Sequence, residues 1–94
     1  MKIYTSSRLL DKNHIFPDSI YIDDSGVTIK RPGLLSSKEE TIPFSKISSV
    51  NIDCPMIGFS SIIISTTTQD REIKSNGFLK KEVKEMREII LNQI

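Results

Sequence analysis

The sequence contains very few of the residues on which most catalytic and metal sites depend. It has one histidine, His14, and one cysteine, Cys54, among 94 residues. A metal site needs several converging His, Cys or carboxylate ligands, and a histidine base needs a positioned partner. No Ser-His-Asp arrangement, glycine-rich phosphate loop or paired-histidine motif is present. We therefore expect no enzymatic activity, no metal and no other cofactor. His14 is interpreted as a solvated loop residue and Cys54 as a small core residue.

Long hydrophobic runs are also missing. The longest is Ile62-Ile63-Ile64, whereas a transmembrane helix needs about 20 apolar residues. Ser6, Ser7 and Arg8 interrupt the apolar stretch of about 7–15 residues that a signal peptide requires. A single cysteine cannot form an intrachain disulfide and fits a reducing compartment. These features predict a cytoplasmic protein.

Neither sign of charge is in excess. The chain has 13 Lys and Arg against 12 Asp and Glu, for a formal net charge of +1. Because nucleic-acid binders usually carry a basic patch, we expect no nucleic-acid partner. With 37% hydrophobic and 27% charged residues, the composition is that of a folded chain. Its length suits one domain, which we place at residues 1–94.

β-Branched residues are abundant, and their pattern predicts strands over residues 2–75. The chain has 16 Ile, 3 Val and 6 Thr, but no Ala and no Trp. Clean alternation in 19–23 and 27–30, joined by the turn residues Asp23-Asp24-Ser25-Gly26, predicts a hairpin. Further strands are expected over residues 2–10, 40–44, 45–54, 59–68 and 71–75. Pro43 should lie at a strand end or a sheet edge. A turn or bulge should lie around residues 45–48, because Ile47 is out of phase with Val50.

The end of the chain has a helical period instead. A helix is predicted over residues 78–93, with Asn76 and Gly77 as its entry residues. Its apolar face should comprise Leu79, Val83, Met86, Ile90 and Ile94, with Phe78 and Ile89 as the shoulder. Glu82 falls inside this apolar arc, so we expect it near the N-terminal rim, where the helix dipole favours an acid. The sheet is the only surface large enough to cover the apolar face.

These elements resemble a bacterial pleckstrin-homology-like (PH-like) domain. The residues that carry the resemblance are the hairpin 20–30 and the segment 40–52, which contains Ile42-Pro43-Phe44-Ser45-Lys46-Ile47. Gly58, the isoleucine-rich strand 62–65 and Phe78 before the helix complete the pattern.

The resemblance covers residues 20–91 and implies a mainly β fold. It implies a seven-stranded, bent antiparallel sheet or partly open barrel, capped by one C-terminal helix. The family implies a binding or scaffolding role, often as a homo-oligomer, without shared catalysis. The chain lacks the closing-helix Trp of eukaryotic members. It also lacks their basic first hairpin loop, since the loop from Leu10 to Asp18 offers only Lys12 and His14. These departures favour a protein partner over a lipid.

One group of basic residues is a candidate ligand site. In a PH-like fold, the loop near residues 31–37 and the loop 10–18 should open at the same end and form an anion site. The candidate ligand-binding residues are Lys12, Lys30, Arg31 and Lys38. The alternative is that they are ordinary solvated charges, offset by the negative charges of Glu39 and Glu40. Leu34-Leu35 in the same loop either dips into a bilayer or partner or folds back on the domain.

Strand edges are the other candidate surface. Edges with few charges can extend a sheet across a subunit boundary. The least charged strand stretches are Asn51 to Asp53 and Ser60 to Thr68. The leading hypothesis is a non-catalytic interaction module with a protein partner or a second copy of itself. The alternative is peripheral membrane or anionic-ligand binding through the basic loops.

Overall fold

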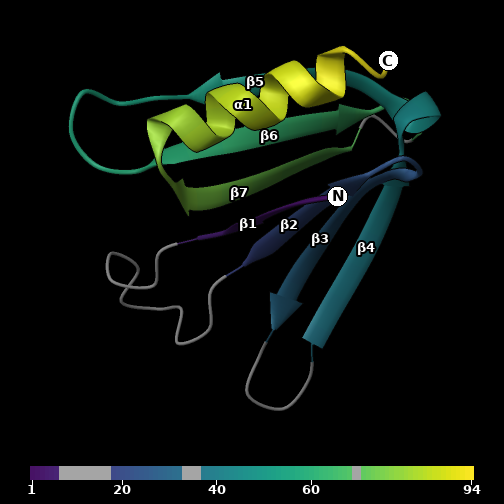
Figure 1. The fold of residues 1–94 in the computed structure, drawn as a ribbon, viewed down its shortest axis with the longest axis horizontal. Helices are drawn as coiled ribbons and strands as arrows, with labels where there is room; N and C mark the ends of the chain where they lie inside the picture. Colours follow the sequence, from purple (N-terminus) through teal and green to yellow (C-terminus); the bar gives the residue numbers. More distant parts are fainter. Residues whose placement is uncertain (7–17, 33–36, 69–70) are drawn as a thin grey trace.

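The computed structural model describes residues 1–6, 18–32, 37–68 and 71–94. These residues form seven strands, a short 3₁₀ turn (η1, Phe44–Lys46) and one α-helix (α1, Lys80–Leu91) (Figure 1). The strands are β1 (Lys2–Thr5), β2 (Ser19–Asp23), β3 (Gly26–Pro32), β4 (Ser37–Pro43), β5 (Ile47–Asp53), β6 (Ser60–Thr66) and β7 (Glu72–Phe78).

The strands divide between two antiparallel sheets. One has the order β1-β2-β3-β4 and the other the order β5-β6-β7. The mainly β fold with seven antiparallel strands and one C-terminal helix is therefore confirmed. The sheets do not close into a barrel, and they diverge toward the far end of the β3–β4 hairpin (Figure 1).

The predicted hairpin is present as β2 and β3. Ile20 and Ile22 are buried on one face of β2, while Tyr21 is half-buried on the other. In the turn, Asp23 Oδ1 accepts hydrogen bonds from the Ser25 backbone N–H at 2.8 Å and from Ser25 Oγ at 2.7 Å. These bonds hold the pKa of Asp23 below its usual range because they stabilise the carboxylate.

Several boundaries differ from the prediction. β4 begins at Ser37 and not at residue 40, because Ser37 to Glu39 pair with β3. β7 continues to Phe78, so the assignment of Asn76 and Gly77 to the helix entry was wrong. Asn76 is paired with Ser61 in the sheet, and the Ser61 hydroxyl also donates to the Asn76 side chain.

Other features of the strands agree with the sequence. β4 ends at Pro43, and the irregularity expected around residues 45–48 consists of η1 and a bulge between Ile47 and Ser49. β1 begins at Lys2 as expected and ends at Thr5. The expected continuation of that strand to residue 10 lies outside the described residues.

The helix buries most of its predicted apolar face. Val83, Met86 and Ile90 are fully buried. Leu79 was placed wrongly on that face: it is extended backbone before the helix and 49% exposed. Ile94 lies beyond the helix and is also exposed. Glu82 lies at the N-terminal rim as predicted, where its Oε1 accepts the Leu79 backbone N–H at 2.8 Å.

The core forms where the helix lies across the β5-β6-β7 sheet and where the two sheets face each other (Figure 1). Tyr4 from β1 reaches this core, and Phe78 is buried between β7 and α1. The buried apolar residues are Tyr4, Ile20, Ile22, Val27, Ile29, Ile42, Ile47, Val50, Ile62, Ile64, Ile73, Phe78, Val83, Met86 and Ile90. Ile and Val supply most of this core, whereas no Thr is buried.

Candidate functional site

The structure places two of the predicted basic residues on one face of the sheet and a third on the other face. Lys30 and Arg31 are neighbours in β3, and neighbouring strand residues point to opposite faces. Arg31 is in phase with the buried Val27 and Ile29, so it lies on the inner face of the sheet. Lys38 is opposite Arg31 in the register and shares this face. Lys12 lies outside the described residues.

Lys30 has partners on the outer face. Its Nζ lies 3.8 Å from Glu39 Oε2 and 4.5 Å from the centre of the Tyr21 ring. A cation over an aromatic face gains from the ring quadrupole, and the carboxylate offsets its charge. Lys30 therefore acts as a cross-strand contact of the outer face.

Arg31 connects the two sheets. Its Nη2 donates to the Lys74 carbonyl of β7 at 2.6 Å, and its Nε lies 3.8 Å from Asp18 Oδ2. Asp18 also accepts a hydrogen bond from Ser75 Oγ at 3.2 Å. An arginine with several donors can satisfy a carbonyl and a carboxylate at once. The guanidinium thus joins β3 to the edge of β7.

A cleft of about 720 Å³ lies between the β3–β4 end and the start of β7. Arg71 and Glu40 form an ion pair across it. Its charged lining residues are Arg31, Lys38, Arg71 and Lys74 together with Glu39, Glu40 and Glu72. With both signs present, the field in the cleft favours no one class of charged ligand. Ligand binding by Arg31 and Lys38 stays a prediction.

The strand edges differ in how well they are protected. Of the described edge strands, β1 has four residues, and β4 carries Lys38, Glu39, Glu40 and Pro43. β7 has two charged residues and is already bonded to Arg31 through the Lys74 carbonyl. Proteins block unwanted pairing of edge strands by keeping them short, by placing charged residues or proline in them, or by covering them with other groups.

β5 has the lowest proportion of charged residues among these edges, although Arg87 Nε donates to its Val50 carbonyl as Arg31 does to Lys74 of β7. Its sequence Ile47-Ser48-Ser49-Val50-Asn51-Ile52-Asp53 contains one charged residue, and it pairs with β6 on one side. The bulge between Ile47 and Ser49 limits the regular stretch to Ser49–Asp53. Asn51 to Asp53, one candidate for self-association, lies on this edge strand, and self-association itself stays a prediction. Ser60 to Thr68, the other candidate, contains β6, which is central and paired on both sides and so has no free edge.

A groove of about 420 Å³ runs beside this edge, between β5 and α1. Ile52 and Leu91 supply its apolar part, and Lys84, Arg87 and Glu88 its charged part. Arg87 Nε donates to the Val50 carbonyl of β5 at 3.4 Å. The groove offers space for a side chain of a polypeptide lying along β5.

Tyr4 and Glu85 form a contact that sequence patterns did not indicate. The Tyr4 hydroxyl donates to Glu85 Oε1 at 2.6 Å, and Lys2 Nζ lies 3.6 Å from the same oxygen. Burial, and then the bond to Glu85, raise the pKa of Tyr4 well above its usual range. The same bond lowers the pKa of Glu85. The two residues are 81 positions apart, so no spacing rule could have linked them.

The remaining candidates have structural surroundings. Cys54 is half-buried and packs against the core, as predicted. His14 lies outside the described residues. Within the described ranges no three His, Cys, Asp or Glu side chains gather as metal ligands would.

Comparison with known proteins places the chain in a family. A family model described as a bacterial PH domain matches residues 18–94. Searches of curated proteins and of solved structures found no significant match. The one helix among the described residues is not a candidate for crossing a bilayer. Since the match covers the second to the seventh strand and the helix, the chain belongs to the bacterial PH domain family, whose PH-like fold is generally a non-catalytic module.

Proposed function

We propose that the chain is a non-catalytic docking module that pairs with a second copy of itself along the edge of β5. The observation that carries the proposal is the composition of that edge. β5 has one charged residue and ends a three-stranded sheet. An edge strand has a row of backbone donors and acceptors available to another strand.

Antiparallel pairing about Val50 suits the side chains of this strand, and it requires Arg87 Nε to release the Val50 carbonyl. It places Ser49 opposite Asn51 of the second copy, within the regular stretch Ser49–Asp53. No like charges face each other along the strand, and short polar pairs are tolerated at such positions. A continuous six-stranded sheet would result, three strands from each copy.

A charged edge residue tests this proposal. Asn51 is exposed on β5, and Asn51→Lys introduces the charge that other proteins use to prevent edge pairing. Light scattering after gel filtration should show a dimer that grows with concentration in the wild type and is lost in Asn51→Lys. Thr5→Lys makes the matched change on the edge strand β1 and should leave the dimer intact.

Two results would contradict the proposal. One is a wild type that stays monomeric at high concentration. The other is a dimer equally stable in Asn51→Lys and Thr5→Lys. The anion-site alternative has less support, because Lys30 and Arg31 point to opposite faces and each lies beside a carboxylate.

A further inference from the structure

The loop between β5 and β6 carries two bare hydrophobic side chains. Met56 and Ile57 are 102% and 91% exposed, more than any other large hydrophobic residue that the structure describes. The loop projects beyond the end of the sheet (Figure 1). Single exposed hydrophobic residues are ordinary, but two at the tip of a projecting loop form a site that can enter an apolar phase.

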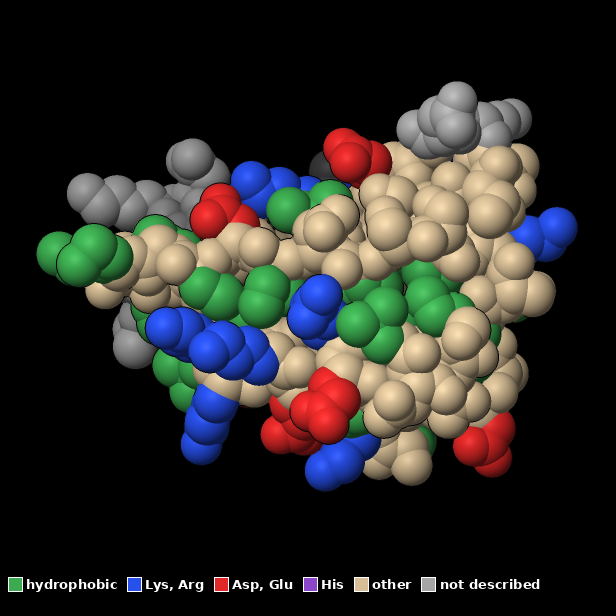
Figure 2. All heavy atoms as spheres, turned by 90° about the horizontal axis from the view of Figure 1, so that it is seen from above, with side chains coloured by type: hydrophobic (Ala, Val, Ile, Leu, Met, Phe, Trp, Pro, Cys, Tyr) green, Lys and Arg blue, Asp and Glu red, His purple; other side chains and the backbone are tan. Residues whose placement is uncertain are grey.

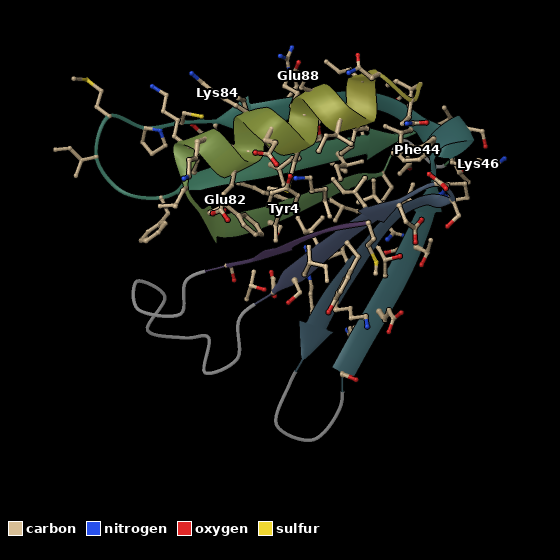
Figure 3. The ribbon with its side chains drawn as sticks, viewed as in Figure 1. Tyr4, Phe44, Lys46, Glu82, Lys84 and Glu88 are labelled. Atoms are coloured by element: carbon tan, nitrogen blue, oxygen red, sulfur yellow. The ribbon has the colours of Figure 1, made fainter. Side chains whose placement is uncertain are left out.

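The start of α1 lies beside this loop. Ser60, the first residue after the loop, pairs with Phe78, which is the last residue of β7 and lies two residues before the helix. The half-exposed Leu79 and then Lys80, Lys81 and Lys84 follow, all on the surface. Figure 2 shows hydrophobic side chains at this end of the molecule with Lys or Arg side chains next to them. Figure 3 shows Lys84 near the loop end of the helix.

The acidic residues of this helix half are used elsewhere. Glu82 accepts the Leu79 backbone N–H, and Glu85 binds Tyr4 and Lys2. None of the ion pairs among the described residues involves Lys80, Lys81 or Lys84. With the Glu85–Lys2 pair counted as neutral, Lys80, Lys81 and Lys84 stand against Glu82 and Asp53, which leaves a local excess of one positive charge beside the apolar tip.

We propose that this end of the molecule docks on an anionic membrane surface. Met56 and Ile57 enter the region between headgroups and acyl chains, and Lys80, Lys81 and Lys84 lie against acidic headgroups. A projecting apolar tip fits a bilayer interface, and a lysine near a negative surface adds to the attraction. The positive rim selects an acidic surface over an uncharged apolar pocket of a partner protein. The site is separate from Lys30, Arg31 and Lys38, and it shares only Lys84 with the groove beside β5.

Sedimentation with vesicles tests the hydrophobic part. The full chain should bind phosphatidylcholine vesicles that contain phosphatidylserine and should bind pure phosphatidylcholine at least about tenfold more weakly, since each lysine contributes about fivefold. Met56→Ser with Ile57→Ser should weaken binding at least about tenfold. Ile3→Ser with Ile94→Ser, two exposed hydrophobic positions elsewhere, should not. No binding at low salt, or equal loss in both variants, overturns the proposal.

A second variant pair tests the charges. Lys81→Gln with Lys84→Gln should weaken binding by about 25-fold, at about fivefold per lysine. The control is Lys46→Gln, an exposed lysine that Figure 3 shows at the other end of the molecule. If Lys46→Gln weakens binding as much per removed charge as Lys81→Gln with Lys84→Gln does, binding depends only on net charge and the proposed membrane site is wrong.

Fluorescence reports directly on the orientation. The chain has no tryptophan, so Ile57→Trp introduces a single reporter at the loop tip. Its emission should shift to shorter wavelength with phosphatidylserine vesicles, whereas that of Ile3→Trp on β1 should not. An unshifted Ile57→Trp in a sample that sediments with vesicles would overturn the proposed orientation.

Discussion

Tyr4 ties the first strand to the C-terminal helix through one hydroxyl group. The side chain is only 6% exposed, and its hydroxyl reaches Glu85 at 2.6 Å. The sequence predicted a strand over residues 2–10, but not which element would cover it. The helical period left Glu85 off the apolar face and gave no link between it and β1. The contact depends on how β1 and α1 meet in space, which local patterns do not specify.

The pH dependence of stability should report this contact. The lowered pKa of Glu85 gives a contribution that is present above its ordinary value of about 4.3 and is lost as pH falls through the folded-state pKa. The raised pKa of Tyr4 gives a second contribution to stability, which is present below pH about 10 and is lost as pH rises further.

Tyr4→Phe should therefore lower the free energy of unfolding most between these limits. Urea denaturation of both proteins at acidic, neutral and alkaline pH measures the difference. The difference in the free energy of unfolding between the two proteins should become smaller at both acidic and alkaline pH. A difference that does not change with pH would show that the Tyr4 hydroxyl and Glu85 are not coupled.

Gly26 is the residue at which backbone geometry is most restrictive. Its φ is +151°, and a Cβ built there would lie 2.3 Å from the carbonyl oxygen of Ile42. The sequence indicated a turn at this point, but the close approach of β4 depends on the sheet. Gly26→Ala should destabilise the fold by about 1–3 kcal/mol or more, because the backbone must shift.

Gly58→Ala is the control for Gly26→Ala. Gly58 also has a positive φ, +101°, but its Cβ would meet nothing within 4 Å. Thermal denaturation should show the larger loss for Gly26→Ala. Equal losses would mean that the contact with Ile42 adds nothing to the backbone strain.

At the scale of elements, periodicity predicted the interior of each element better than its ends. Val83, Met86 and Ile90 are buried as the helical period requires, yet Leu79 lies before the first turn. A period continues into a neighbouring strand without a visible break, so the boundary depends on backbone hydrogen bonds. The pairing of Asn76 with Ser61 decides where β7 ends.

Glu82 allows a test of how the helix begins. Its carboxylate accepts the backbone N–H of Leu79, one of the donors that a helix start leaves unpaired. Glu82→Ala should lower stability by about 0.3–1.5 kcal/mol. Glu82→Gln keeps an oxygen acceptor and should lose less in denaturant titrations, whereas Glu88→Ala, near the other end of the helix, should change little. Equal losses of stability in Glu82→Ala and Glu82→Gln would show that the Glu82 side chain does not stabilise the start of the helix as an acceptor.

For the molecule as a whole, the order of the strands within each sheet could not be predicted from the sequence. Low charge marked both Asn51 to Asp53 and Ser60 to Thr68, but only the arrangement of the sheets shows that β5 is an edge and β6 is central. The opposite directions of Lys30 and Arg31 could have been foreseen. Both residues lie in β3, and neighbouring strand residues point to opposite faces, so the two side chains cannot face the same ligand.

Hydrogen exchange of the β5 amides tests the docking edge most directly. Pairing of two copies at β5 predicts that amides of residues 49–53 become more protected as protein concentration rises. Those of β4, on an edge with charges and a proline, should exchange at a constant rate. Protection at residues 49–53 that does not change with concentration, or that rises equally in β4, would contradict strand pairing at β5.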